Sequence, residues 1–223
     1  MQIKPIAHIK TDYKEKFGIP RQSGRSPSSI GKIVFEKEFN SSEAVRGIEN
    51  FTHIWMIFGF SKIKYEKFSP TVRPPRLGGN RRVGVFATRS PYRPNSLGLS
   101  SVKLVSVEEE KGKITLIVSG ADLLDGTPIY DIKPYLPQTD CHIDAKGGYS
   151  DENWKHALEV VFPEKLLNLV SNEKQNALLE CLSDDPRPSY QDDDRIYRML
   201  FSEYEISFKV NEKELTVIEV KII

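Results

Sequence analysis

One stretch of the chain, residues 71–99, concentrates arginine, glycine and proline. It has no acidic residue, and its six arginines are Arg73, Arg76, Arg81, Arg82, Arg89 and Arg93. Arginine carries a planar fork of donors that suits phosphates and carboxylates, and its flat face stacks on bases. Proline restricts the backbone, whereas glycine lets it approach a ligand closely. The stretch therefore predicts a preorganised site for an anionic, nucleotide-like ligand; a solvated basic edge with structural turns is the alternative interpretation.

A second group of candidate residues is acidic and lies within residues 120–137. Asp122, Asp125 and Asp131 occur there among glycines and prolines, directly after a well-patterned strand. Carboxylates at a strand end can hold a cation, accept hydrogen bonds from hydroxyl groups or act as a general base. Asp-Gly is also a common turn pair, so turn formation alone could explain Asp125 and the glycine that follows it.

The other candidates are weaker. Residues 18–22 (GIPRQ) form a polar turn in a basic loop. His53 interrupts an apolar run, where a buried core histidine is more common than a ligand, and no histidine or cysteine has the spacing of a metal site. The chain also lacks a P-loop, a G-x-G-x-x-G fingerprint, a G-x-S-x-G elbow and the zinc deaminase signature. We therefore expect no metal and no Rossmann-type cofactor site.

The elements that must position these residues are mainly short strands. Six β-branched or aromatic segments bounded by turn residues predict strands at 3–9, 32–39, 52–60, 83–88, 102–107 and 113–119. A capping pattern at Asn40-Ser41-Ser42-Glu43 predicts one short helix. Many short strands without long intervening helices favour an antiparallel sheet or barrel over a doubly wound parallel sheet.

The pattern changes after a polar segment at residues 138–155, which we interpret as a linker. Residues 157–162 predict a strand, and Pro163 then suits the first position of a helix whose apolar spacing continues to Leu182. Two alternating runs within residues 204–217 predict a hairpin with a four-residue loop at its centre.

These elements predict a mainly β fold in two domains. The first, residues 1–140, is expected to be an antiparallel sheet or barrel. The second, residues 155–223, is expected to be a small α+β domain.

Composition narrows the class of protein further. The chain has 223 residues, 39% of them hydrophobic and 28% charged, as in ordinary globular proteins. No apolar run is long enough to span a membrane, no secretory signal is evident and only two cysteines occur, so a cytoplasmic location is expected. Residues 1–100 hold 18 Lys/Arg and 7 Asp/Glu, whereas residues 101–223 hold 14 and 24. The basic first part suggests a polyanionic partner.

Five longer segments have specific sequences: GIPRQ (18–22), FTHIWMIFGF (51–60), VRPPRLGGN (72–80), GVFATRSPYRPNSLGLSSVKL (84–104) and GADLLDGTPIYDIKPYLP (120–137). Together they resemble the TsaA-like family, in the family's order, and DPRPSY (185–190) resembles a motif in the second domain of its bacterial members. The resemblance implies a β-barrel methyltransferase that uses S-adenosylmethionine to methylate the exocyclic nitrogen of threonylcarbamoyladenosine beside the tRNA anticodon. It also implies a homodimer with the cofactor close to the subunit interface.

The resemblance also implies roles for individual residues. It assigns the cofactor to Pro20, Arg21, Gln22, Ser61, Lys62, Arg89, Leu99, Asp125, Gly126, Thr127 and Pro128. Relatives often have His and Gln or Glu in place of Ser61-Lys62, so backbone contacts would persist there but side-chain contacts would not. Asp125 is expected to bind hydroxyl or amino groups of the cofactor. Either Asp131 or Asp122 could accept the proton from the substrate nitrogen, and this choice stays open.

The remaining arginines, Arg73, Arg76, Arg81, Arg82 and Arg93, are expected to bind phosphates of the anticodon loop and the threonyl carboxylate. The second domain is expected to serve tRNA use more than cofactor binding. Two other functions stay open: a non-catalytic RNA-binding β-barrel module with the same basic loops, and a dimer that binds a small molecule without nucleic acid.

Overall fold

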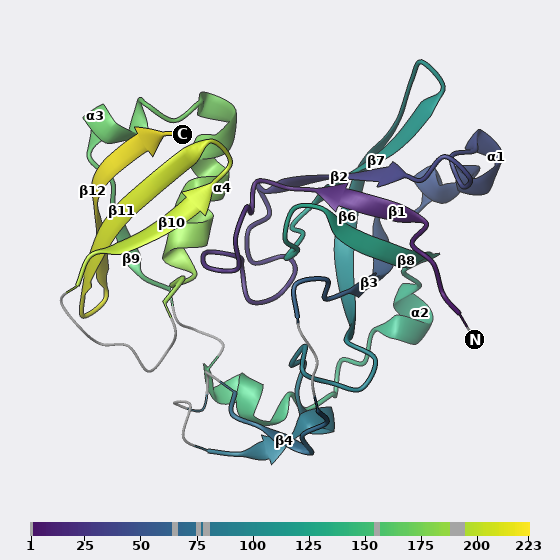
Figure 1. Cartoon of the computed structure of the whole chain (residues 1–223), viewed down its shortest axis with the longest axis horizontal. Helices are drawn as coiled ribbons and strands as arrows, with labels where there is room; N and C mark the ends of the chain where they lie inside the picture. Colours follow the sequence, from purple (N-terminus) through teal and green to yellow (C-terminus); the bar gives the residue numbers. More distant parts are fainter. Residues whose placement is uncertain (1, 64–66, 75–76, 78–80, 154–156, 188–194) are drawn as a thin grey trace.

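The computed structural model of the chain describes residues 2–63, 67–74, 77, 81–153, 157–187 and 195–223. Figure 1 shows a barrel beside a smaller sheet, with the C-terminus on the sheet and the N-terminus on the far side of the barrel. The barrel is closed, has the strand order β1-β2-β7-β6-β3-β8, and every neighbouring pair is antiparallel. Its strands are β1 (Ala7–Lys10), β2 (Ile30–Phe35), β3 (His53–Gly59), β6 (Leu97–Glu110), β7 (Lys113–Ser119) and β8 (Thr127–Pro134). The predicted antiparallel β-barrel is confirmed.

Side-chain alternation along the strands builds the barrel core. In β3, Ile54 and Met56 point inward and are fully buried, whereas His53 is exposed. The expectation of a core histidine is therefore wrong: successive strand residues face opposite sides, and the buried isoleucine at 54 fixes residue 53 outside. The long strand β6 pairs with β3 through its first half and with β7 through its second half, with a bulge between Leu104 and Ser106.

Three loops meet at one end of the barrel as a consequence of this antiparallel order. They are residues 11–29 between β1 and β2, residues 60–96 between β3 and β6, and residues 120–126 between β7 and β8. Each of these loops carries one of the candidate segments singled out by composition. The barrel thus brings together residues that lie more than a hundred positions apart in the chain.

The loop of residues 60–96 contains less strand than predicted. Among its described residues, β4 (Thr71–Val72) pairs with β5 (Val83–Gly84), and Val85–Ala87 form a 3₁₀ turn, η3. The prediction of a strand over residues 83–88 is wrong beyond Gly84 because β4 offers only two residues as partners. The Thr88 hydroxyl instead donates to the Val85 carbonyl oxygen and closes the turn.

Other local differences have similar causes. The predicted short helix is confirmed as α1 (Ser42–Val45), followed by the 3₁₀ turn η1 (Ile48–Asn50). The segment interpreted as a linker holds α2 (Pro137–Asp140) and a 3₁₀ segment, η4 (Gly148–Asn153). Strand β8 was not predicted, because its prolines and its aspartate indicated a loop; the prolines lie at or next to the strand's ends, where a missing N–H is tolerated.

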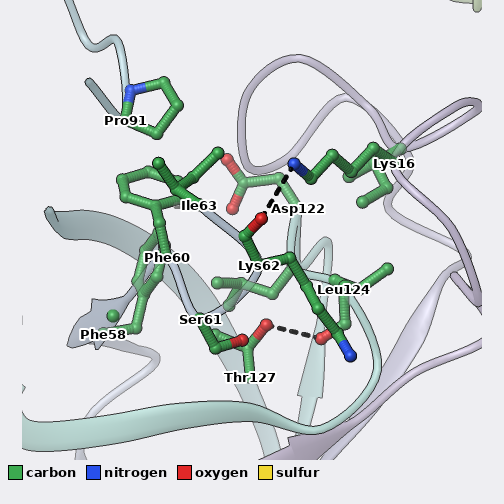
Figure 2. Close-up of a pocket in the computed structure, with 13 residues that line it drawn as sticks. Lys16, Phe58, Phe60, Ser61, Lys62, Ile63, Pro91, Asp122, Leu124 and Thr127 are labelled. Atoms are coloured by element: carbon green, nitrogen blue, oxygen red, sulfur yellow. Dashed lines mark hydrogen bonds between the residues drawn. The ribbon is translucent and has the colours of Figure 1, made fainter. Parts of the chain in front are cut away.

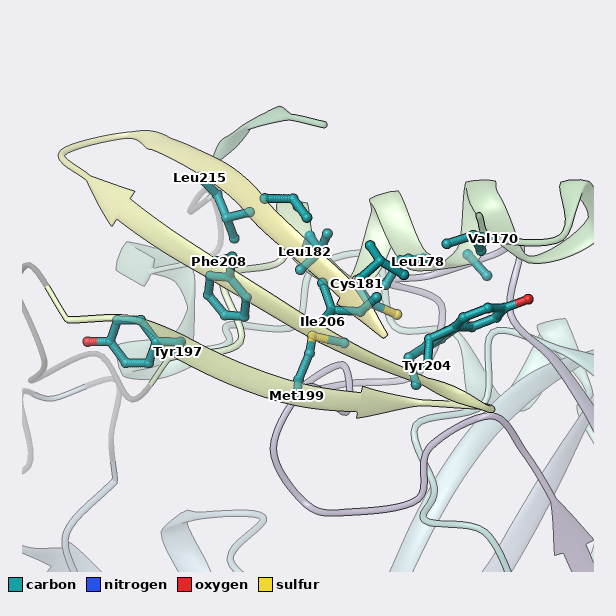
Figure 3. Close-up of a cluster of buried hydrophobic side chains, with 14 of the residues drawn as sticks. Val170, Leu178, Cys181, Leu182, Tyr197, Met199, Tyr204, Ile206, Phe208 and Leu215 are labelled. Carbon is teal, nitrogen blue, oxygen red and sulfur yellow. The ribbon is translucent and has the colours of Figure 1, made fainter. Parts of the chain in front are cut away.

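The C-terminal unit is a four-stranded sheet with helices on one face, which confirms the α+β prediction. The sheet has the order β10 (Tyr197–Phe201), β11 (Tyr204–Asn211), β12 (Glu214–Ile222) and β9 (Glu159–Val161). The helices are α3 (Glu164–Leu167) and α4 (Asn172–Ser183). Figure 3 shows α4 packed over the sheet, where Leu178, Leu182, Ile206 and Phe208 form a core without solvent access.

Two further observations complete the fold. The β11–β12 hairpin has a two-residue loop rather than the predicted four, because Asn211 pairs with Glu214, and Glu212 has a φ of 51°. The structure also shows no helix, in the part of the chain it describes, that is long and apolar enough to cross a membrane.

Candidate functional site

A cavity of about 190 Å³ lies at the end of the barrel where the three loops meet (Figure 2). The β1–β2 loop contributes Lys16 and Ile19, and the end of β3 contributes residues 58–63. Residues 122–124 and Thr127 form the third side, and Pro91 comes from the arginine-rich stretch. The GIPRQ segment, the end of β3, the arginine-rich stretch and the acidic segment 120–137 therefore all contribute to the cavity wall.

Aromatic side chains form much of the wall. Phe58 and Phe60 meet edge to face, with ring centroids 5.2 Å apart. A Cβ atom at Gly98 on the neighbouring strand would lie 2.2 Å from the Phe58 ring, so glycine there makes room for this ring. Stacking on aromatic faces is a common way to hold a planar base.

Asp122 is the acidic group of the cavity. Its side chain is partly buried, and the Ser100 hydroxyl donates a hydrogen bond of 2.7 Å to Oδ1. Burial raises the pKa of Asp122, because desolvation penalises the charged form; the Ser100 hydrogen bond and the nearby Arg89 charge offset only part of that rise. A carboxylate with a raised pKa is a better proton acceptor near neutral pH than an ordinary aspartate.

Asp131 lies elsewhere on the barrel. Its side chain is 45% exposed, its Oδ2 pairs with Lys133 Nζ at 3.0 Å, and it does not line the cavity. Of the two carboxylates between which the sequence did not choose, only Asp122 faces the cavity.

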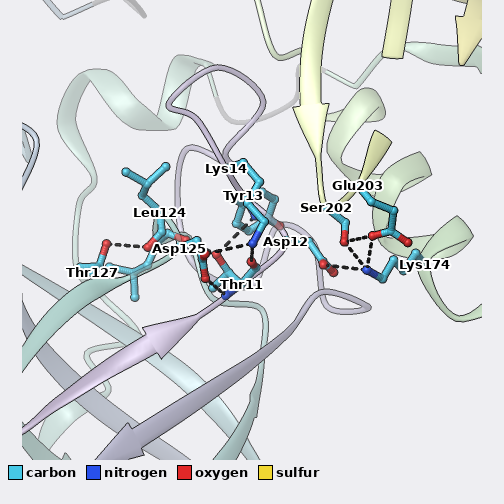
Figure 4. A network of polar contacts seen from close by, with 11 residues as sticks. Thr11, Asp12, Tyr13, Lys14, Leu124, Asp125, Thr127, Lys174, Ser202 and Glu203 are labelled. Atoms are coloured by element: carbon cyan, nitrogen blue, oxygen red, sulfur yellow. Dashed lines mark hydrogen bonds and ion pairs between the residues drawn. The ribbon is translucent and has the colours of Figure 1, made fainter. Parts of the chain in front are cut away.

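Asp125 is already engaged within the protein. Its Oδ1 accepts a hydrogen bond of 3.0 Å from the Thr11 backbone N–H, and its Oδ2 pairs with Lys14 Nζ at 2.9 Å (Figure 4). The backbone N–H groups of Asp125, Gly126 and Thr127 donate to the carbonyl oxygens of Tyr13, Ile9 and Leu124, respectively. This turn anchors the β1–β2 loop, and of its four predicted cofactor residues only Thr127 lines the cavity; Pro128 does not.

The other predicted cofactor residues are divided between the cavity and its surroundings. Ser61 and Lys62 line the cavity, and Lys16 Nζ donates to the Lys62 carbonyl oxygen at 3.3 Å. Pro20, Arg21, Gln22, Arg89 and Leu99 do not line it.

Two of these residues meet beside the cavity. Arg89 Nη1 donates to Gln22 Oε1, which joins the GIPRQ turn to the arginine-rich stretch.

Leu99 lies opposite Ile57 and is 53% exposed on the outer face of the barrel.

The predicted substrate arginines differ in what they contact. Arg73 and Arg81 are exposed, and the exposed Arg82 donates from Nη1 to the Thr71 hydroxyl at 2.8 Å. Arg93 is partly buried and donates from Nη1 to the Thr88 carbonyl oxygen at 3.0 Å, so it braces its own loop. Arg76 lies outside the described residues, as does part of the DPRPSY segment.

Sequence reasoning missed several cavity residues. Phe58, Phe60 and Ile19 lie in segments that were singled out, but no role was assigned to them. Lys16 has no local signal at all, because its place in the wall results from the course of the β1–β2 loop. Among the described residues, no group of three or more His, Cys, Asp or Glu side chains gathers as a metal site would.

Comparison with known proteins gives the family. Residues 8–141 match the model of the tRNA-methyltransferase O N-terminal domain, and residues 155–223 match the model of the TrmO C-terminal domain. Together the two models cover nearly the whole chain. The chain therefore belongs to the tRNA-methyltransferase O family.

Individual relatives agree with this assignment. The tRNA (adenine(37)-N6)-methyltransferase of Escherichia coli is 39% identical over 220 residues, covering 95% of this chain and 94% of that protein. A putative S-adenosylmethionine-dependent methyltransferase, RcsF, of Pseudomonas aeruginosa is 40% identical over 196 residues, covering 85% and 83%. A crystal structure of TrmO from P. aeruginosa superimposes with a TM-score of 0.81 at 30% identity, covering 100% of this chain and 97% of that one.

The burial of Asp122 predicts a pH-dependent effect on stability. Its folded-state pKa lies above the unfolded value, so its ionisation destabilises the fold as pH rises through that interval, and this penalty is absent below it. Asp122→Asn removes the penalty, so the free energy of unfolding should exceed that of the unmodified chain at pH 7–8. The gain should shrink as pH falls toward 4, as measured by urea unfolding at a series of pH values.

The matched control for this experiment is Asp131→Asn, which changes an exposed carboxylate and should alter stability little at any pH. A gain at position 122 that does not vary with pH would contradict the assignment of a raised pKa.

Proposed function

We infer that this chain is an S-adenosylmethionine-dependent tRNA (adenine-N6)-methyltransferase acting at position 37. We propose that the base it methylates there is threonylcarbamoyladenosine. The observation that carries the proposal is the Asp122 carboxylate, partly buried and hydrogen-bonded to Ser100, in a cavity lined by Phe58 and Phe60 at the loop end of a barrel that belongs to this family.

The residues of the cavity suit S-adenosylmethionine. Phe58, Phe60 and Ile19 offer apolar and aromatic surface for a nucleoside and a thioether chain, and Ser61 and Thr127 offer hydroxyl groups. When bound, the cofactor supplies a methyl group on a sulfonium sulfur, which becomes a neutral thioether as the C–S bond breaks. Strong anionic contacts to that sulfur would stabilise the ground state more than the transition state. We therefore assign Asp122 to the incoming nitrogen rather than to the sulfur.

The role of Asp122 follows from the substrate. The nitrogen attacks the methyl carbon in line with the breaking C–S bond, and its proton must leave as the new N–C bond forms. The exocyclic nitrogen of a carbamoyl-substituted adenine has a delocalised lone pair and is therefore a weak nucleophile. A group that accepts its proton makes the nitrogen more nucleophilic and so favours methyl transfer. Asp122 accepts that proton, and Ser100 holds its carboxylate in place through the hydrogen bond to Oδ1.

The surroundings of the cavity suit an RNA loop. Arg73, Arg81 and Arg82 expose their side chains on the 60–96 loop. Guanidinium groups there would hold phosphates of the anticodon loop and the threonyl carboxylate. A base in a single-stranded loop can be unstacked and inserted, which a duplex base cannot without flipping. Action on tRNA also supports a cytoplasmic location.

We further propose that the chain is divided into domains at residues 1–140 and 155–223 and forms a homodimer. Each domain has its own core of buried hydrophobic residues. On the outer face of the barrel, Leu99 and Val105 are more than half exposed, and Trp55 and Tyr135 pack together with ring centroids 5.5 Å apart. This apolar face supports pairing with a second copy of the chain.

The dimer is tested by light scattering of the purified chain, which should give twice the mass of one chain. Leu99→Asp places a charge in the apolar face and should shift the mass toward a single chain, whereas Ile143→Asp, at a 97% exposed isoleucine in the 141–148 segment, should not. A single-chain mass for the unmodified protein at micromolar concentration would contradict the proposal.

The reaction is tested by nucleoside mass spectrometry of tRNA incubated with the chain and S-adenosylmethionine. Threonylcarbamoyladenosine should gain the mass of one methyl group, and Asp122→Asn should slow this gain by about 100-fold or more because the proton acceptor is lost. Asp131→Asn is the matched control and should leave the rate nearly unchanged.

Methylation of unmodified adenosine in place of threonylcarbamoyladenosine would overturn the substrate assignment. Binding of tRNA with no methyl transfer and no heat on titration with S-adenosylmethionine would instead favour a non-catalytic RNA-binding module.

The arginines make a separate prediction about affinity. Replacing Arg81 and Arg82 by alanine removes two exposed charges, so the slope of log K for tRNA against log salt should fall by about one to two units. Filter binding at several salt concentrations measures this slope. The control is Lys111→Ala with Lys113→Ala, two exposed charges at the turn between β6 and β7. An unchanged slope in the arginine variant would contradict tRNA binding by Arg81 and Arg82 and would favour the interpretation of the stretch as a solvated basic edge.

A further inference from the structure

We propose that the C-terminal domain completes the cofactor site, and that Asp184 is the residue through which it positions the GIPRQ turn. The inference rests on the proposed function, because it concerns the same cavity. It gives the C-terminal domain a role in cofactor binding, in place of the expected role in tRNA use alone. The β1–β2 loop, residues 11–29, connects the C-terminal core to the cavity.

The apolar side of this loop belongs to the C-terminal core. Tyr13 is buried there and meets Phe201 edge to face, with ring centroids 6.0 Å apart. Phe17 stacks against both Tyr197 and Phe208, each at 6.3 Å between centroids. The loop is therefore packed on the C-terminal sheet rather than on the barrel alone.

Ile19 links that core to the cavity. Its side chain packs against the C-terminal cluster and also lines the cavity wall. The neighbouring Gly18 has a φ of +89°, and a Cβ atom there would lie 2.9 Å from Met199 Cε on β10. The backbone at the start of GIPRQ is thus shaped to fit closely against the C-terminal sheet.

Polar contacts from the end of α4 hold the rest of the turn. Asp184, whose side chain is 7% exposed, accepts a hydrogen bond of 2.6 Å from Arg25 Nε and one of 3.3 Å from the Arg21 backbone N–H. The Arg21 guanidinium donates in turn to the carbonyl oxygens of Asp185 and Arg187. A buried carboxylate that bonds both a guanidinium and a backbone N–H defines the position of that backbone strongly.

The turn then reaches the reacting groups through one further contact. Gln22 Oε1 accepts a hydrogen bond from Arg89, and the charge of Arg89 acts on the Asp122 carboxyl in the cavity. Asp184 is therefore connected to Arg89 through two intervening residues, Arg21 and Gln22. It touches neither cofactor nor substrate, so it is a positioning residue.

A second polar contact between the domains supplies a control. Lys174, near the start of α4, pairs with Asp12 at 3.1 Å and with Glu203 at 2.9 Å (Figure 4). The bond to Asp12 also ties the β1–β2 loop to the C-terminal domain, but it reaches the loop away from residues 18–25. Loss of this contact should lower stability without moving the GIPRQ turn.

The test compares Asp184→Ala with Lys174→Met in the full chain, with S-adenosylmethionine affinity measured by calorimetry and tRNA affinity by filter binding. Asp184→Ala should weaken cofactor binding by about tenfold or more, because the two hydrogen bonds that hold the GIPRQ turn in position are lost. The tRNA affinity of Asp184→Ala should stay within about twofold of that of the unmodified chain. Lys174→Met should lower the thermal midpoint but leave cofactor affinity within about twofold. Asp184→Asn keeps an acceptor oxygen and should give an intermediate cofactor affinity; it also replaces the alanine variant if that variant does not fold.

Two results would overturn the inference: unchanged cofactor affinity in both Asp184 variants, or an equal loss in Lys174→Met. Absence of cofactor binding by the unmodified chain would instead contradict the proposed function, so the two failures are distinguishable.

Discussion

The site depends on one physical constraint: the β1–β2 loop, residues 11–29, has no helix or strand, yet many of its polar groups are buried. Buried backbone groups must find partners, and a loop cannot supply them by itself. On the barrel side, Asp125 and the Gly120 carbonyl oxygen bond this loop. On the other side, Glu180 accepts hydrogen bonds from Ser26 and Ser28. The loop is ordered because it is enclosed between two cores, and the cavity wall is ordered with it.

At Asp122 the requirements of stability and of chemistry differ. Burying a carboxylate is unfavourable, and the Ser100 hydrogen bond and the Arg89 charge compensate only in part. The same burial moves the carboxyl toward the protonation behaviour that a proton acceptor requires. Stability and chemistry therefore oppose one another at this residue, which is common at active sites.

Much of the fold could be predicted from local patterns. β-branched and aromatic segments bounded by turn residues predicted the barrel strands other than β8, alternation predicted the C-terminal hairpin, and a capping pattern located α1. The errors have physical causes: β8 contains residues that favour loops in isolation but lie at strand ends, and only two residues near Val83 find a partner strand. His53 was assigned to the core by its apolar neighbours, although strand alternation places it outside. Pairing partners and facing direction depend on the rest of the sheet, which a local window does not contain.

The sequence by itself determined which residue types are available for chemistry: an arginine-rich stretch, an acidic turn and the GIPRQ segment, in an order specific enough to indicate the family. Only the tertiary structure decided what each residue contacts. Asp122 faces the cavity while Asp131 pairs with Lys133 outside, and Asp125 is occupied by Thr11 and Lys14. Lys16 and Ile19 line the cavity because the C-terminal sheet, distant in the sequence, holds the β1–β2 loop in place. The reason is that burial and hydrogen bonding are set by residues far apart in the chain, which composition and spacing do not bring together.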